Sequence, residues 1–178
     1  MNIRNLIRRR HIKRRAKAAY FHGDSLCYWL WCELLYTDDA TERACLLREA
    51  AGTQGAMARA HMRAFGPDPL EHESGRDLAE STRLSSRLLY MLADVEASVA
   101  YAGGPNVLGS HAEDAVLSAE AWEIVHRMAS TPDVDERDAL LWELGDAVEP
   151  TVGGQAAETV YCLSRLPSRP ASSEGVSA

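Results

Sequence analysis

Apolar and small side chains recur at alternating intervals of three and four residues from Leu78 to Ala102. That spacing places them on one stripe of a helix, so we predict a long helix over residues 74–102 that packs along its neighbours. The small residues Ser81 and Ser85 indicate that a neighbouring element approaches closely at its N-terminal end. The stripe consists of Leu78, Ser81, Ser85, Leu88, Leu92, Val95, Val99 and Ala102.

The rest of the chain shows the same helical periodicity, whereas the alternating pattern that marks strands is missing. We expect Gly23 to end the first helix, Gly52 and Gly55 to interrupt a later one, and another to end before Pro150. The sequence predicts an all-α fold, a single bundle of about six or seven mostly antiparallel helices. These helices are expected over residues 2–21, 25–36, 39–65 in two pieces, 74–102, 110–130, 133–149 and 155–166.

Capping patterns support several of these helix starts. Asp39 with Glu42 and Ser110 with Glu113 have the spacing of a capping box, and residues 131–133 favour the start of the next helix. Beyond them, the Ser- and Pro-rich residues 167–178 predict a disordered tail.

The run from Leu26 to Tyr36 is apolar on all sides apart from one glutamate, which predicts a helix at the centre of the bundle or one covered by a partner. It is too short to span a bilayer, which takes about 20 residues. Its aromatic side chains would serve either as a binding hot spot or as core, and we favour core. They are Tyr28, Trp29, Trp31 and Tyr36.

The cysteines form no C-x-x-C pair, and most lie in helical, apolar surroundings. Free thiols of this kind are typical of a reducing compartment, so we expect a cytoplasmic protein. Lys13 and Lys17 are the two lysines among many arginines, which suggests a GC-rich genome, such as that of a bacterium or its phage.

Positive charge is concentrated at one end of the chain. Residues 1–20 carry eight basic groups and no acidic one, whereas residues 21–178 carry eleven basic and 26 acidic groups, a net charge of −15. We therefore divide the chain into a basic N-terminal helix or arm (1–22), a helical bundle domain (23–166) and the tail (167–178).

The basic helix is the first candidate functional site. Clustered cations on a helix neutralise phosphates of a nucleic acid backbone and give affinity without sequence choice. We expect a small binding or regulatory protein, not an enzyme, that needs no cofactor and contacts nucleic acid or an acidic protein surface. Membrane attachment, pairing with the chain's own acidic body and a homodimer remain alternatives. The expected contact residues are Arg8, Arg9, Arg10, Lys13, Arg14, Arg15 and Lys17.

Two pairs of carboxylates form the alternative site. Glu120 and Glu123 flank the apolar face of one predicted helix, and Glu143 and Asp146 flank the corresponding edge of the next. If these helices pack antiparallel, the four carboxylates share one seam, which suits Mg²⁺. The alternative is two solvated helix flanks, with Glu123 paired to Arg127 four residues on.

This E-x-x-E, spacer, E-x-x-D pattern, with Trp-Glu-Leu-Gly-Asp around its second half, resembles the all-helical nucleotide pyrophosphohydrolases of the MazG type. The resemblance covers residues 120–146. It implies Mg²⁺-dependent cleavage of a nucleoside triphosphate to the monophosphate and pyrophosphate, with the four carboxylates holding the metal.

Overall fold

A computed structural model describes residues 3–65, 72–101, 108 and 117–165, and the side chains of these except 3–6, 8–9 and 72–74. Every regular element in this part of the chain is a helix, which confirms the all-α prediction. The helices are α1 (Ile3–Leu34), α2 (Ala40–Phe65), α3 (His72–Ala100), α5 (Ala119–Ala129), α6 (Val134–Val152) and α7 (Gly154–Tyr161).

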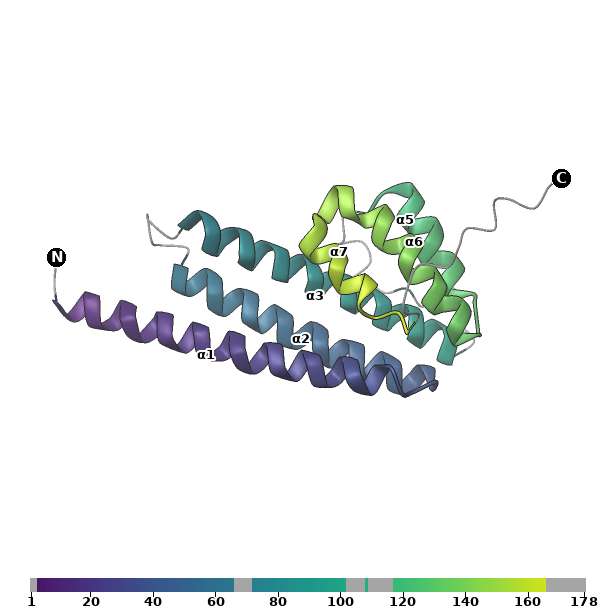
Figure 1. Ribbon diagram of the computed structural model, residues 1–178, viewed down its shortest axis with the longest axis horizontal. Coiled ribbons are helices and arrows are strands. Elements are labelled where there is room, and N and C mark those ends of the chain that lie inside the picture. The colour runs from purple at the N-terminus through teal and green to yellow at the C-terminus, as the bar shows by residue number, and fades with distance from the viewer. Residues whose placement is uncertain (1–2, 66–71, 102–107, 109–116, 166–178) are drawn as a thin grey trace.

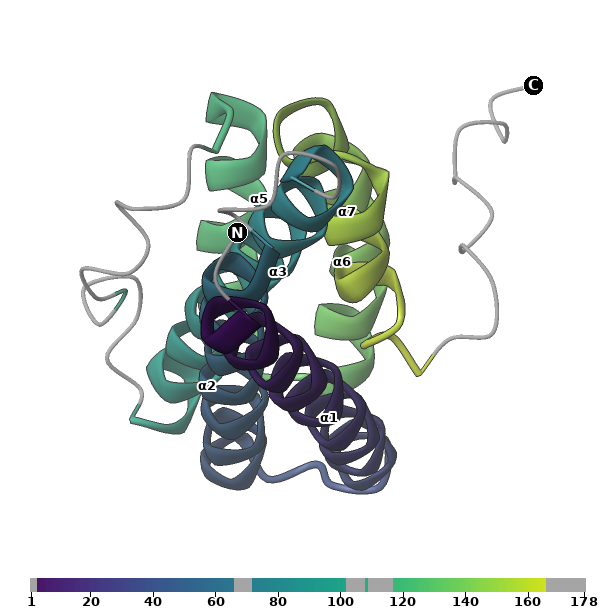
Figure 2. The ribbon, with the colours of Figure 1, turned by 90° about the vertical axis from the view of Figure 1, so that its left-hand side faces the viewer.

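The three long helices lie in a row, with α2 between α1 and α3 (Figure 1). The shorter helices α5, α6 and α7 form a group on the other side of α3, as the view along the long axis also shows (Figure 2). Helix α1 therefore forms one edge of the molecule. Among the described helices, α2 is the one that makes extensive contact with α1.

Helix α3 is the centre of the fold. Eight consecutive residues, 91–98, are buried, so helices surround this part of α3 on all sides. Its Leu88 and Met91 pack in one core with Leu47 of α2 and Val125 of α5. The predicted long helix is thus confirmed, and it occupies the central place that the sequence had assigned to residues 26–36.

The predicted break at Gly23 is wrong, because α1 continues through it. Gly23 is buried, and a Cβ at this position would collide with the side chain of Met57 in α2. A glycine inside a helix costs about 1 kcal/mol relative to alanine, which the close approach of two helices can offset. This glycine marks a helix crossing, and the arm and the first bundle helix are one element.

Two further predicted breaks are also absent. Helix α2 runs through Gly52 and Gly55, and close to these glycines the Ser86 hydroxyl of α3 donates to the Ala51 carbonyl at 2.7 Å. Helix α6 runs through Pro150, which lies in its last turn, and ends at Gly153 with a φ of 82°.

Two of the predicted helix caps are present in the structure. Asp39 Oδ1 accepts from the Glu42 amide at 2.8 Å, and Asp133 Oδ1 accepts from two amides at the start of α6. Ser118 caps α5 by accepting from the Ala121 amide at 3.1 Å, so this helix begins at Ala119 and the predicted start at residue 110 is wrong. The predicted Ser110–Glu113 capping box and the predicted tail, 167–178, lie outside the described residues.

None of the helices, as far as the chain is described, has the length and apolar character needed to cross a bilayer.

A buried ionic network joins the long helices to the C-terminal group. Arg43 Nε of α2 donates to Glu96 Oε1 of α3 at 2.8 Å, and Arg137 Nη2 of α6 donates to Glu96 Oε2 at 2.9 Å. Arg43 Nη2 also reaches Asp138 Oδ1 at 3.2 Å. All four side chains are at least 95 % buried, so each charge depends on its partners.

Arg165 extends this network beyond α7 to the surface. Its Nε donates to Asp138 Oδ2 at 2.8 Å, and its Nη atoms reach Asp38 and Asp135 at 2.6 and 2.9 Å. The network thus ties α2, α3, α6 and the segment after α7 into one register.

Candidate functional site

The basic half of α1 is seated on α2 by a small aromatic cluster. The Tyr20 ring lies 5.1 Å from the His61 ring, which lies 4.8 Å from the Phe65 ring, and Ala16 is buried beside them. Burial, reinforced by Lys17, lowers the pKa of His61. Tyr20 therefore anchors the basic helix on α2.

The predicted contact residues do not all have the same surroundings. The Lys13 ammonium lies 5.4 Å above the Phe65 ring, so α2 already engages it. Arg10, Arg14, Arg15 and Lys17 are exposed, and none of them forms an ion pair with a carboxylate of the described residues. The side chains of Arg8 and Arg9 lie outside that description.

Four aromatic side chains, in and just after α1, are predicted to fill the core. Three of them are exposed, so the prediction is wrong for those three. Tyr28, Trp29 and Tyr36 are 66, 64 and 88 % exposed, and Phe21 is 70 % exposed. Trp31 packs against the core as predicted. Tyr28, Trp29 and Tyr36 project away from α2, because Leu30, Leu34 and Cys27 occupy the buried side of α1.

The basic and aromatic residues share one side of α1. Arg14, Phe21 and Tyr28 follow at seven-residue intervals, which places them within about 40° of one another around a helix with 3.6 residues per turn. The outward face of α1 is defined here as Arg10, Arg14, Lys17, Phe21 and Tyr28. The basic and the aromatic residues are evident in the sequence, and the seven-residue spacing is the signal from which their common side could have been predicted.

The four candidate carboxylates do not come together as a metal site. Glu120 and Glu123 are exposed on α5, while Glu143 of α6 accepts from Arg127 Nη1 at 2.9 Å. Asp146 accepts from the Tyr161 hydroxyl at 2.7 Å. The expected Glu123–Arg127 pair is replaced by the bridge from Arg127 to Glu143, which puts a cation where the seam required the metal.

Across the described part of the chain, no three His, Cys, Asp or Glu side chains are placed to hold a metal ion together. The Mg²⁺ site implied by the resemblance to pyrophosphohydrolases is therefore not formed by these residues.

No known family model, curated protein or solved structure matches this chain. Any functional conclusion therefore depends on the chain's own residues, and the outward face of α1 is a surface whose basic side chains lack carboxylate partners among the described residues.

Proposed function

We propose that this protein binds nucleic acid through the outward face of α1. The observation that carries the proposal is that Arg10, Arg14 and Lys17 are exposed without a carboxylate partner among the described residues. A polyanion supplies the missing counter-charges and releases its own condensed cations on binding, which is favourable at moderate salt.

The acidic remainder of the molecule directs where a polyanion binds. Residues 21–178 have a net charge of −15, so they repel phosphates from most of the surface. Helix α1 lies at an edge of the molecule, which leaves its outward face accessible (Figure 1).

The exposed rings favour a single strand over a duplex. Phe21 and Tyr28 follow the cations on the same side, and unpaired bases stack on such rings while the phosphates follow the basic groups. The outward face runs from Arg10 to Tyr28 along α1, so it extends over roughly 27 Å at about 1.5 Å per residue.

A salt titration tests this proposal. Binding of the full chain to fluorescently labelled single-stranded DNA, RNA and duplex DNA is measured by anisotropy at several salt concentrations. Because each phosphate contact contributes about 0.7 to the slope of log affinity against log salt for single strands, the double variant Arg10→Gln/Arg14→Gln should reduce that slope by about 1.4.

Arg127→Gln is the matched control, because Arg127 is also an exposed arginine but already has a carboxylate partner. Its slope should stay at the wild-type value. An absence of binding at low salt, or equal losses in both variants, would contradict the proposal. Binding to anionic vesicles or to an acidic polypeptide in preference to every nucleic acid would instead assign the face to one of those partners.

A further inference from the structure

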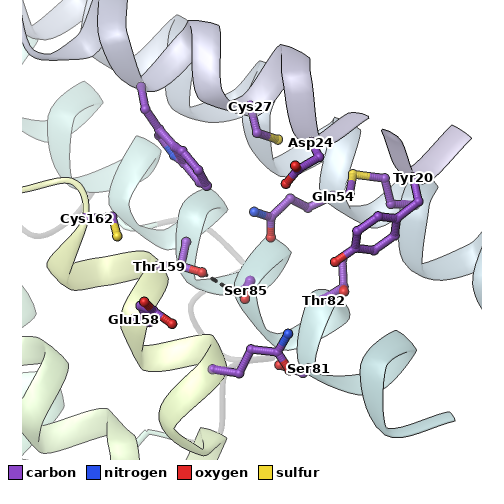
Figure 3. Close-up of a pocket in the computed structure, with 13 residues that line it drawn as sticks. Tyr20, Asp24, Cys27, Gln54, Ser81, Thr82, Ser85, Glu158, Thr159 and Cys162 are labelled. Atoms are coloured by element: carbon purple, nitrogen blue, oxygen red, sulfur yellow. Dashed lines mark hydrogen bonds between the residues drawn. The ribbon is translucent and has the colours of Figure 1, made fainter. Parts of the chain in front are cut away.

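A cavity of about 280 Å³ lies on the inner side of α1, between that helix, α2, α3 and α7 (Figure 3). Tyr20, Asp24, Cys27 and Trp31 line it from α1, at intervals of four, three and four residues that form one helical face. The centre of this face is turned away from the outward face, but Asp24 is exposed and lies only about 20° around the helix from Lys17, so the cavity and the proposed nucleic acid surface adjoin at Asp24. Its volume is close to the lower limit of about 300 Å³ for small-molecule sites.

The charge of the cavity lining is negative. Asp24 of α1 and Glu158 of α7 line it from two helices, and no lysine, arginine or histidine lies among the described lining residues (Figure 3). Burial, with Asp24 nearby, raises the pKa of Cys27 to about 11. The pKa values of Tyr20 and Cys162 are also raised by burial, so all three groups are neutral at neutral pH and the two carboxylates set the charge.

The inner part of the cavity contains polar groups without partners. Gln54 is 7 % exposed, and its Oε1 accepts no hydrogen bond within the described structure. Trp31 Nε1 is likewise buried without an acceptor there. A buried polar atom left unpaired costs about 1–3 kcal/mol, so a ligand that donates to Gln54 removes an existing penalty.

We propose that this cavity binds a small organic amine, whose positive charge is balanced by Asp24 and Glu158 and which donates a hydrogen bond to Gln54 Oε1. The indole of Trp31 offers a ring face that attracts cations, and Met57 adds apolar contact for the carbon chain. A bare metal ion does not fit this lining, because no three His, Cys, Asp or Glu side chains of the described residues are placed to hold one together.

The ligand also fills a gap between α1 and α7, which otherwise make little contact with each other. Helix α1 packs extensively on α2, and Thr159 of α7 donates to Ser85 of α3 at 3.0 Å across the cavity floor (Figure 3). An amine whose charge is balanced by both carboxylates therefore links α1 to α7, and its binding should stabilise the whole fold.

Calorimetric titration of the full chain in a buffer without amines tests the site. Diaminobutane, aminobutanol and butanediol share one carbon chain and carry two, one and no ammonium groups. We expect one diaminobutane per chain, weaker binding of aminobutanol and weakest binding of butanediol. Equal binding of the diamine and the diol, or no binding of the diamine at millimolar concentrations, would overturn the proposal.

Variants separate a defined site from general attraction of amines to an acidic protein. Asp24→Asn and Glu158→Gln should each weaken diaminobutane binding by roughly three- to tenfold. The control Glu120→Gln removes an exposed carboxylate from α5, a helix that does not line the cavity, and should change nothing. Equal losses in all three variants would show attraction by net charge and would reject the site.

Gln54→Met distinguishes a ligand-binding role of Gln54 from a purely structural one. It removes an acceptor that has no hydrogen-bond partner in the described structure, together with the contact between the Gln54 amide and the Cys27 thiol, so the melting temperature of the free protein should change little. Diaminobutane binding should nevertheless weaken by about tenfold. Unchanged binding in this variant would remove Gln54 from the site and overturn its assigned role.

Discussion

Arginines of this chain occur in two opposite environments. Arg43 and Arg137 are 2 and 1 % exposed and are held by Glu96, which bridges them, and by Asp138. Arg10 and Arg14 of α1 are exposed and have no carboxylate partner in the described fold. The same guanidinium group therefore fixes helix register in one place and is available to an external anion in the other.

The difference lies in which helical face carries the charge. Arg43 precedes Leu47 and Ala50 on the buried stripe of α2, so folding removes it from water and requires a partner. Arg14 is one heptad before Phe21, on a side of α1 that no described element covers. A buried arginine thus has its donors committed by the fold, whereas an outward one keeps them for a ligand.

The largest expected effect comes from breaking the buried network. Glu96→Gln leaves the guanidinium groups of Arg43 and Arg137 with one fewer negative charge in a dry environment. We expect the free energy of unfolding to fall by about 3–5 kcal/mol, as for other buried ion pairs that lose one partner. Urea unfolding followed by circular dichroism measures this change.

Glu120→Gln is the control for that experiment, because it removes an exposed carboxylate that has no such partners. Its effect should stay within about 0.5 kcal/mol. If the two variants unfold at the same urea concentration, the network does not hold the helices together and the contrast between the two sets of arginines fails.

The next effect concerns the rings beside the outward arginines. Phe21→Ala and Tyr28→Ala should each weaken single-stranded binding by about 1–3 kcal/mol, the contribution of one stacked base, and leave duplex binding nearly unchanged. Anisotropy with matched single- and double-stranded oligonucleotides measures both.

Trp142→Phe is the comparison variant for these rings, because Trp142 packs on Tyr161 at 5.3 Å and donates to Ser164, away from α1. It should leave binding unchanged. If Phe21→Ala instead changes the oligomeric state by analytical ultracentrifugation while binding persists, the rings mediate self-association and not stacking.

His61, which lies where the basic helix packs on α2, should make stability depend on pH, and we expect this effect to be smaller than the two above. Burial and the nearby Lys17 lower the pKa of His61, so between about 6.5 and its lower native value the unfolded chain binds the proton that the native chain does not. Stability should therefore decrease as the pH falls through this window. His61→Phe should flatten the dependence in urea titrations, whereas His126→Gln on α5 should keep it.

Sequence patterns predicted the fold class and most helix positions, because periodicity and capping are local. They failed where tertiary packing overrides propensity: Gly23, Gly52 and Gly55 were read as breaks but lie inside helices, two of them directly against a neighbour's side chain. Pro150 is tolerated because it lies in the last turn of α6.

The candidate site was predicted in part. The basic residues followed from composition, but the exposed rings were assigned to the core because an apolar run does not reveal which side another helix covers. The ionic network and the cavity depend on residues far apart in sequence, such as Glu96 with Arg137 and Asp24 with Glu158. The local signal for the ionic network is Arg43, a charged residue on the apolar stripe of α2.

The smallest expected effect is the sharpest test of the comparison. Arg10→Gln/Arg14→Gln should change the free energy of unfolding by less than about 0.5 kcal/mol, because neither side chain has a carboxylate partner to lose. Urea unfolding should therefore match the wild type while the salt slope of nucleic acid binding decreases. A clear loss of stability would mean that these arginines already hold the fold together, and the distinction between committed and available arginines would no longer apply to α1.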